Sequence, residues 1–286
     1  MTAINIEMKI FKSSTILIVI LLILMVAYYL ILQNYKAHDT NNMPTDAHND
    51  TLVHKKQINN KVSIDTIVSV DFLTGKFNPA KDTSFTLVDP EYGGRSDMYL
   101  LKDTYKAFIK MFYAAQHDGV KLYIISATRN FVYQKSIWEQ KWNGSKLVEG
   151  KNLATSVKDP VKRAEIILKY SSMPATSRHH WGTDVDLNSM DDKYFSTTEG
   201  KIVYNWLCAN ASKYGFCHPF NSKNERSSGY EEEKWHWSYM PLSRIFLNQY
   251  KNKVTYANIT GFSGCETALK LEVIKNYVLS INSECK

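Results

Sequence analysis

Several features that would indicate a function class are missing from this chain of 286 residues. No glycine-rich phosphate loop occurs, so the usual signal of a nucleotide-binding fold is absent. There is no long block of lysine and arginine, and basic and aromatic residues do not alternate as they do in nucleic-acid binders. Internal repeats and low-complexity tracts are also missing. We therefore expect a globular protein without a nucleic-acid partner.

The formal net charge is +7 at pH 7. An excess of positive charge suits an anionic environment such as a cell-wall polymer, a membrane surface or nucleic acid. A surface rich in solvated lysines produces the same number. This second interpretation is the simpler one, because no basic block locates the charge in one place.

Cysteine is scarce, and its four copies all lie in the last third of the chain, at Cys208, Cys217, Cys265 and Cys285. No Cys-x-x-Cys pair occurs, which argues against a structural zinc knuckle. An even number in an exported chain indicates disulfides, and we expect the local pairs Cys208–Cys217 and Cys265–Cys285. In a reducing compartment four free thiols would be expected instead.

One apolar run, residues 15–32, has no charged residue between Lys12 and Lys36. About 20 such residues are needed to span a bilayer. Lys9 and Lys12 precede the run and only Lys36 follows closely, which favours a cytoplasmic N-terminus. A cleaved signal peptide is the alternative, but no small-x-small cleavage site follows the run. We predict a single transmembrane helix in the lipid bilayer, with the rest of the chain outside the cytoplasm, in the periplasm or on the cell-wall side.

The remaining pattern divides the chain into four parts. Residues 1–36 hold the cytoplasmic N-terminus and the anchor, and residues 37–65 are a polar tether. Residues 66–245 form the predicted globular domain, and residues 246–286 a helical extension.

Apolar spacing predicts helices over residues 98–117, 131–142, 161–170, 199–214 and 265–281. Strands are predicted over residues 121–127 and 234–239 and around Asp186. Because helices and strands do not alternate regularly, an α+β fold is favoured over a doubly wound one.

Two short segments carry the chemistry. The first is Ser-Arg-His-His-Trp-Gly-Thr-Asp-Val-Asp, which brings His179 and Asp186 to either side of Gly182. The second, some fifty residues later, contains Glu233 and His236. Two imidazoles and a carboxylate match the three protein ligands of a catalytic zinc site.

Glu233 lies three residues before His236, near enough to act as a general base without being a ligand. Taken singly, these signals are weak. A single histidine is more often a hydrogen-bonded structural residue, and a Glu-x-x-His pair arises easily by chance. The coincidence of both segments in an exported chain is what favours a bound Zn²⁺ ion.

Three motifs together resemble a known family. Ser177-x-His179-x-x-Gly182-x-x-x-Asp186, followed by Glu233-x-Trp235-His236, is similar to the pattern of the VanY-like D-alanyl-D-alanine carboxypeptidases. These belong to the metallopeptidase superfamily that includes lysostaphin and the hedgehog signalling domain. The stretch from Ser126 to Gln134 also resembles the family's Ser-x-x-Arg-x-x-x-x-Gln element. The resemblance covers roughly residues 67–242.

The resemblance implies a role for each matching residue. His179, Asp186 and His236 would be the ligands of one Zn²⁺ ion, and Glu233 the catalytic base. Arg129 would anchor the substrate and stabilise charge on the scissile carbonyl, since a guanidinium forms paired charge-assisted bonds.

Two further residues match polar positions that line the substrate site in the family, Gln134 and Ser177. The implied fold is an antiparallel sheet with flanking helices, like that of the hedgehog and D-Ala-D-Ala peptidase domains.

Two departures from the family pattern leave choices open. Position 184 is usually a small residue, but here it is Asp184, which on a strand points the same way as Asp186. The alignment prefers Asp186 as the ligand, and Asp184 is then expected to face the pocket or to orient a ligand histidine. His179 and His180 are adjacent, and the motif register selects His179. Trp181 is expected to line the substrate cleft.

The implied activity is removal of the terminal D-alanine from peptidoglycan stem peptides that end in D-Ala-D-Ala. An endopeptidase or an L,D-carboxypeptidase with the same zinc site is the first alternative. A cell-wall-binding protein that keeps zinc but has lost catalysis is an alternative of another class, and the presence of Glu233 argues against it.

Overall fold

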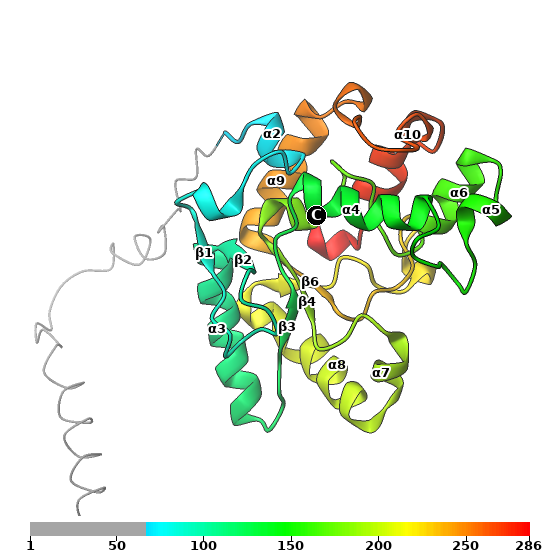
Figure 1. The fold of residues 1–286 in the computed structure, drawn as a ribbon. Helices are drawn as coiled ribbons and strands as arrows, with labels where there is room; N and C mark the ends of the chain where they lie inside the picture. The colour runs from blue at the N-terminus through cyan, green and yellow to red at the C-terminus, as the bar shows by residue number, and fades with distance from the viewer. Residues whose placement is uncertain (1–66) are drawn as a thin grey trace, which may run out of the picture. The chain divides into compact units, whose positions relative to one another are not determined.

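The computed structural model describes residues 67–286 (Figure 1). The predicted anchor and tether lie outside these residues. Within the described part, no helix combines the length and the apolar character needed to cross a membrane.

A four-stranded antiparallel sheet organises this part of the chain. Its order is β3-β4-β6-β5, and a separate two-stranded sheet pairs β1 with β2. The strands are β1 Phe85–Leu87, β2 Tyr99–Leu101, β3 Ile124–Ser126, β4 Asp184–Leu187, β5 Phe216–Cys217 and β6 His236–Tyr239. The predicted antiparallel sheet with flanking helices is confirmed.

The two central strands, β4 and β6, carry apolar side chains on one face and polar side chains on the other. Val185, Leu187 and Trp237 belong to a buried apolar cluster that also includes residues of α3 (Lys102–His117) and α8 (Thr198–Asn210). Because side chains alternate along a strand, the acidic residues of β4 and His236 of β6 point to the other face. One face of the sheet is therefore a packing surface, and the other carries the polar site.

A second apolar cluster packs on the polar side of the sheet and around its end. It draws on α2 (Val70–Leu73), α4 (Phe131–Trp142), α6 (Pro160–Ile167) and α9 (Met240–Lys253) (Figure 1). The remaining helices are α5 Leu153–Ser156, α7 Asp192–Ser196 and α10 Thr267–Lys270.

Local chemistry explains where the helices near the site begin. The Asn130 side chain caps α4 by accepting from the Tyr133 N–H, and Asp159 caps α6, with Pro160 in its first turn. The predicted helix 131–142 is confirmed to the residue. The helix predicted from residue 98 begins at Lys102, because residues 99–101 pair with β1 as a strand.

The C-terminal segment differs from the prediction. Instead of one helix over 265–281, the chain forms the four-residue α10 and then a π-helical turn at Ile274–Val278, with Glu272 between them at a φ of 46°. The predicted boundary at 245/246 falls inside α9, whose buried Phe246, Leu247 and Tyr250 belong to the second apolar cluster. Residues 67–286 belong to one compact unit, and the segment after residue 245 is part of it.

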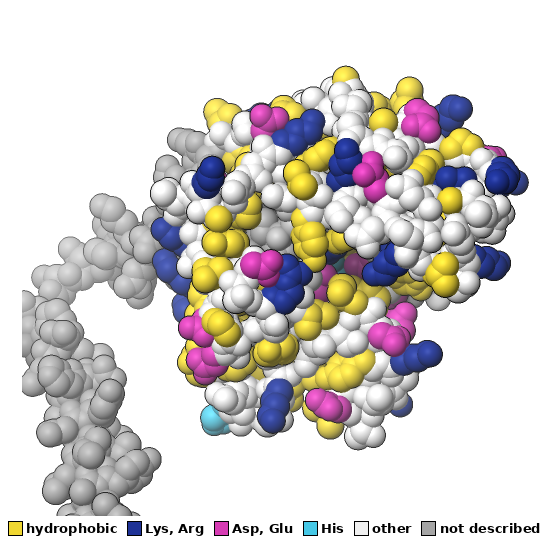
Figure 2. Space-filling model, in the orientation of Figure 1, with side chains coloured by type: hydrophobic (Ala, Val, Ile, Leu, Met, Phe, Trp, Pro, Cys, Tyr) yellow, Lys and Arg dark blue, Asp and Glu magenta, His cyan; other side chains and the backbone are white. Residues whose placement is uncertain are grey.

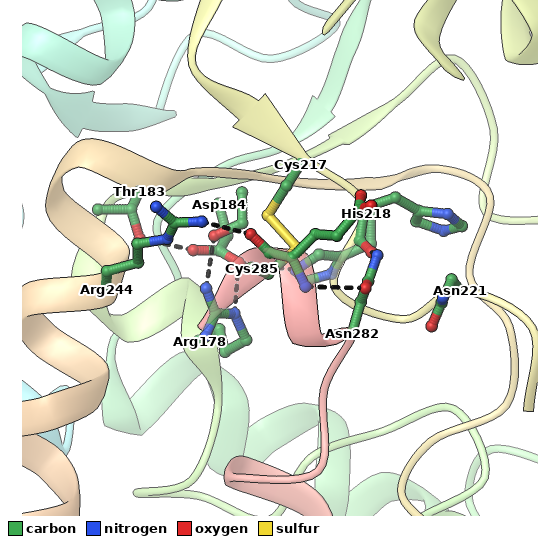
Figure 3. Close-up of a disulfide and its surroundings, with 12 residues drawn as sticks. Arg178, Thr183, Asp184, Cys217, His218, Asn221, Arg244, Asn282 and Cys285 are labelled. Atoms are coloured by element: carbon green, nitrogen blue, oxygen red, sulfur yellow. Dashed lines mark hydrogen bonds and ion pairs between the residues drawn. A yellow bond between two sulfur atoms is a disulfide. The ribbon is translucent and has the colours of Figure 1, made fainter. Parts of the chain in front are cut away.

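The expected cysteine pairing is wrong. Cys217 of β5 is bonded to Cys285, while Cys208 and Cys265 are free thiols (Figure 3). Sequence-local pairing fails because the C-terminal tail returns to β5, where the Asn282 N–H donates to the Pro219 carbonyl. Cys208 lies on the exposed side of α8.

Replacing Cys285 with serine tests the contribution of this bond to stability. The disulfide closes a loop between residues 68 positions apart, for which loop-closure entropy gives about 4 kcal/mol. We expect Cys285→Ser to lower the free energy of unfolding in urea by this order. Cys208→Ser, at an exposed free thiol, is the matched control and should change it by less than about 0.5 kcal/mol. Equal effects of the two variants would contradict the assignment.

Candidate metal centre

The register of β4 and β6 brings an acid and an imidazole together. Asp186 lies directly opposite His236, and Asp184 lies opposite Ser238. Since residues directly opposite on one face are close neighbours, the pairing alone puts Asp186 beside the His236 ring. Oδ1 of Asp186 is 3.3 Å from Nδ1 of His236.

The second imidazole comes from the turn before β4. His179 lies in the short helix Arg178–Trp181, which Gly182 ends at a φ of 70°. A Cβ on Gly182 would also meet the Phe85 ring at 2.4 Å, so the turn requires glycine. The His179 Nδ1–H donates to the Ala127 carbonyl at 2.8 Å, which aims Nε2 at Oδ1 of Asp186, 3.2 Å away.

Three buried atoms of this cluster face one another without a hydrogen-bond partner: Nε2 of His179, Oδ1 of Asp186 and Nδ1 of His236. All lie within 4.8 Å of one another. Burial lowers the pKa of His179 to about 4, so its Nε2 is a lone-pair acceptor that faces a carboxylate oxygen. Because Nε2 of His179 and Oδ1 of Asp186 are both acceptors, this buried pair favours a cation between them.

The donor set fits a small divalent cation. Neutral imidazole nitrogens and a carboxylate oxygen are suitable ligands, and bonds of about 2.0–2.1 Å in a tetrahedron put ligand atoms about 3.3 Å apart. The separations of Asp186 Oδ1 from His179 and His236, 3.2 and 3.3 Å, match this edge. The structure therefore describes a possible metal site formed by His179, Asp186 and His236.

A second layer of buried charge fixes His236. Its Nε2–H donates to Oδ1 of Asp184 at 2.9 Å, which leaves Nδ1 to face Asp186. Asp184 also accepts from Arg178 Nε at 3.0 Å and from the Thr183 hydroxyl at 2.5 Å (Figure 3). With these partners Asp184 orients a histidine, and Asp186 alone of the two acids is within reach of both imidazoles.

The charges around the two acids outweigh the effect of burial. Burial opposes ionisation of Asp186, but His179 and Arg129 hold the pKa of this carboxyl well below its ordinary value. Burial likewise opposes the charged form of His236, yet the carboxylates around it, Asp184 first, raise the pKa of this ring well above its ordinary value. A cation that binds at Nδ1 takes the place of that proton.

Glu233 lies beside the three facing atoms but is not one of them. Its Oε2 is 3.4 Å from Nδ1 of His236, and its side chain is 9% exposed. The backbone is held twice, since its N–H donates to the Phe220 carbonyl and its own carbonyl accepts from His218 Nε2 at 2.9 Å. Burial raises the pKa of Glu233, although His236 opposes the shift. A basic carboxylate is thus fixed at the edge of the site.

Arg129, between β3 and α4, contacts the same cluster from another side. Its NH2 donates to Oδ2 of Asp186 at 3.1 Å, and its NH1 lies 3.4 Å from Oε1 of Gln134. The two oxygens of Asp186 are therefore divided between the guanidinium and the imidazoles. Gln134 and Ser177 are both buried and lie behind the cleft wall, and Gln134 donates to the Ser172 carbonyl.

His180 points away from the facing atoms. Its Nδ1–H donates to the Arg129 carbonyl at 2.6 Å, and its Nε2 accepts from the Ala175 N–H. Gly75, at a φ of 74°, packs so closely on this ring that a Cβ would meet Nδ1 at 2.3 Å. His180 thus holds the backbone from which Arg129 reaches the site.

The cluster lies in a cleft of about 780 Å³, and Figure 2 shows the hollow with charged side chains at its rim. α4 contributes Tyr133, Ile137 and Lys141 to the wall, and the loop before α7 contributes Asp191. Trp235 lines the cleft, but the expectation for Trp181 is wrong. Trp181 is fully buried and packs against Phe246 and Tyr250 in the apolar cluster.

Sequence reasoning missed three residues that shape the site: Arg178, His218 and Lys141. The sequence contains a clue to the role of two of them, Arg178 and Lys141. Arg178 stands inside the first motif, next to His179, and a buried arginine there requires an acid such as Asp184. Lys141 follows Gln134 by two helical turns and so shares its inward face. No local pattern indicates that His218 holds the carbonyl of Glu233.

Two imidazoles, a carboxylate and a neighbouring glutamate in a cleft are the groups from which the sites of metal-dependent hydrolases are built. Residues 97–242 match the family model VanY, D-alanyl-D-alanine carboxypeptidase. The chain belongs to this family of hydrolytic peptidases.

Two relatives with similar sequences carry names that are consistent with this family. The YodJ protein of Bacillus subtilis (strain 168), to which a carboxypeptidase activity is ascribed, is 26% identical over 193 residues, 64% of this chain. A D-alanyl-D-alanine carboxypeptidase of Enterococcus faecium is 26% identical over 160 residues, 56% of this chain. The chain spans 62% and 43% of the lengths of these two relatives.

Among solved structures, VanYB in complex with D-Alanine-D-Alanine is similar with 22% identity and a TM-score of 0.44. The match covers 67% of this chain and 90% of the other.

Replacing Arg178 tests the buried charge network independently of activity. Its side chain and that of Asp184 are 1% and 0% exposed, so Arg178→Met leaves a buried carboxylate without its ion-pair partner. We expect the free energy of unfolding to fall by about 3–5 kcal/mol. The control is Arg95→Met, which breaks a pair whose side chains are 42% and 68% exposed and should cost at most about 1 kcal/mol. The interpretation fails if chemical denaturation gives the two variants the same loss.

Proposed function

We propose that this protein is a zinc-dependent D-alanyl-D-alanine carboxypeptidase that trims peptidoglycan stem peptides. One observation carries the proposal: one oxygen and two nitrogen atoms, buried and without hydrogen-bond partners, face one another beside the buried Glu233, in a member of the VanY family. His179, Asp186 and His236 would hold the ion. When bound in such a site, Zn²⁺ polarises the carbonyl oxygen and makes water a better nucleophile at neutral pH.

Glu233 would move the proton. Its carboxylate, raised in pKa by burial, takes the proton of the attacking water and returns it to the nitrogen of the leaving D-alanine. Its position supports this role, because its Oε2 lies 3.4 Å from Nδ1 of His236, one of the three candidate ligand atoms. The backbone bonds to Phe220 and His218 keep it there.

Arg129 would stabilise the negative charge that develops on the scissile carbonyl oxygen. Its guanidinium lines the cleft beside Asp186, and its side chain is 16% exposed, so a substrate can reach it. Fixed donors of this kind stabilise a transition state because they need no reorganisation during the reaction.

We further propose that the peptidase part acts outside the cytoplasm, on the cell-wall side of a membrane anchor at residues 15–32. The apolar run in the sequence supports this location. The Cys217–Cys285 bond adds support, since disulfides persist in oxidising, extracytoplasmic environments.

Replacing Glu233 separates proton transfer from metal binding. Glu233→Gln keeps the three ligands, so the zinc content of the purified full-length protein should stay at the wild-type level. Release of D-alanine from a peptide ending in D-Ala-D-Ala, followed by mass spectrometry, should fall by about 10²–10⁴-fold. Glu232→Gln, one residue away, should retain activity. Near-normal turnover of Glu233→Gln would remove this residue from the mechanism.

Replacing Asp184 tests whether this acid positions the candidate ligand His236. Asp184→Asn weakens the acceptor that orients His236, and zinc affinity, measured by competition with a chromogenic chelator, should fall about 10–100-fold. Asp191→Asn, an exposed acid of the same cleft, is the control and should leave affinity unchanged. Equal affinities of the two variants would show that Asp184 does not position a ligand.

A further inference from the structure

Lys141 is a cation of the cleft that the proposed chemistry does not use. It lies in the last turn of α4, two turns after Gln134, and lines the cleft together with Arg129 and Glu233. Its ammonium group donates to Oγ of Ser171. None of the ion pairs within residues 67–286 involves Lys141.

The surroundings of Lys141 favour an anion. Burial, followed by the charge of Lys146, lowers the pKa of Lys141 to about 8, so the side chain is still cationic at neutral pH. An ammonium has three donors, and Ser171 accepts from one of them. The charge of Glu233 opposes the lowering of this pKa but does not outweigh burial, and an anion that enters the cleft and contacts the ammonium would stabilise it further.

Arg129 is not free to bind this anion with its whole guanidinium. Its NH2 is bonded to Asp186 and its NH1 faces Gln134. These two contacts leave fewer of its five N–H donors open to a peptide carboxylate. Of the basic residues that line the cleft, Arg129 is thus directed at the metal site, and Lys141 is bonded to a hydroxyl and not to a carboxylate.

We propose that Lys141 and Ser171 form the subsite for the free C-terminal carboxylate of the substrate peptide. This inference rests on the proposed function and deepens it, because it explains why the enzyme would remove a terminal residue. Arg129 then serves the scissile carbonyl, and Lys141 the carboxylate of the leaving D-alanine.

The same contact separates exopeptidase from endopeptidase activity. An internal peptide bond, or a C-terminal amide, presents no negative charge and leaves the ammonium unpaired in the cleft. A site with a buried polar group rejects ligands that fail to pair with it.

The test measures binding without turnover and then turnover itself. In zinc-loaded full-length Glu233→Gln protein, calorimetry compares a peptide ending in D-Ala-D-Ala with the same peptide as its C-terminal carboxamide. The free acid should bind about 10–100-fold more tightly. Adding Lys141→Met should abolish that difference with little change for the amide, and Lys141→Arg, which keeps the charge, should restore part of it. Lys193→Met, at an exposed lysine of the same cleft, should leave it intact.

Measurements of turnover distinguish the carboxylate subsite from the proposed function. With Glu233 present, Lys141→Met should raise KM for the free acid about 10–100-fold with a smaller change in kcat. If wild type releases D-alanine but Lys141→Met weakens acid and amide equally, the carboxylate subsite is wrong and the proposed function stands. If wild type releases no D-alanine while the acid still binds through Lys141, the proposed function is wrong and the subsite stands. Equal binding of acid and amide by the Glu233→Gln protein would overturn the subsite directly.

Discussion

The site depends on one buried carboxylate oxygen that the fold holds between two imidazoles. Oδ1 of Asp186 faces Nε2 of His179 and Nδ1 of His236 at 3.2 and 3.3 Å. The raised pKa of His236 favours a proton at Nδ1, and a cation that replaces this proton and binds all three atoms turns the arrangement into a coordination site. The β4–β6 register and the Gly182 turn impose the arrangement.

The charges in and around the cluster are arranged to receive a divalent ion. Three carboxylates, Asp184, Asp186 and Glu233, and two guanidinium groups, Arg129 and Arg178, leave one negative charge, which a proton on His236 offsets. A divalent ion that replaces this proton gives the cluster one positive charge. Such a centre stabilises an anionic transition state, and each guanidinium holds one acid in place. Lys141 extends the positive potential along the cleft to where a terminal carboxylate would lie.

The sequence predicted the parts of the site whose positions follow from local spacing. His179 and Asp186 flank a glycine turn, His236 alternates with Trp235 and Trp237 on a strand, and α4 was predicted to the residue. The structure brings these residues together as expected. It also places Asp186, and not Asp184, within reach of both imidazoles, which alternation alone could not indicate because both acids point to the same face.

Long-range packing explains what the sequence did not show. The tail returns to β5 and pairs Cys285 with Cys217, a contact across 68 positions that no local pattern encodes. The predicted C-terminal helix is interrupted at Glu272, and Trp181 turns into the apolar cluster because α9 packs over it. The sequence did not indicate a role for Lys141, because a lysine on a helix is usually exposed to solvent. Its contact with Ser171 in the cleft follows only from the folded structure.

X-ray absorption at the zinc edge of the purified full-length protein tests the central claim most directly. The account predicts one zinc per chain, with only nitrogen and oxygen neighbours at about 2.0–2.1 Å and the scattering pattern of two imidazole rings. A metal-free protein, or a shell of sulfur neighbours at about 2.3 Å, would contradict it.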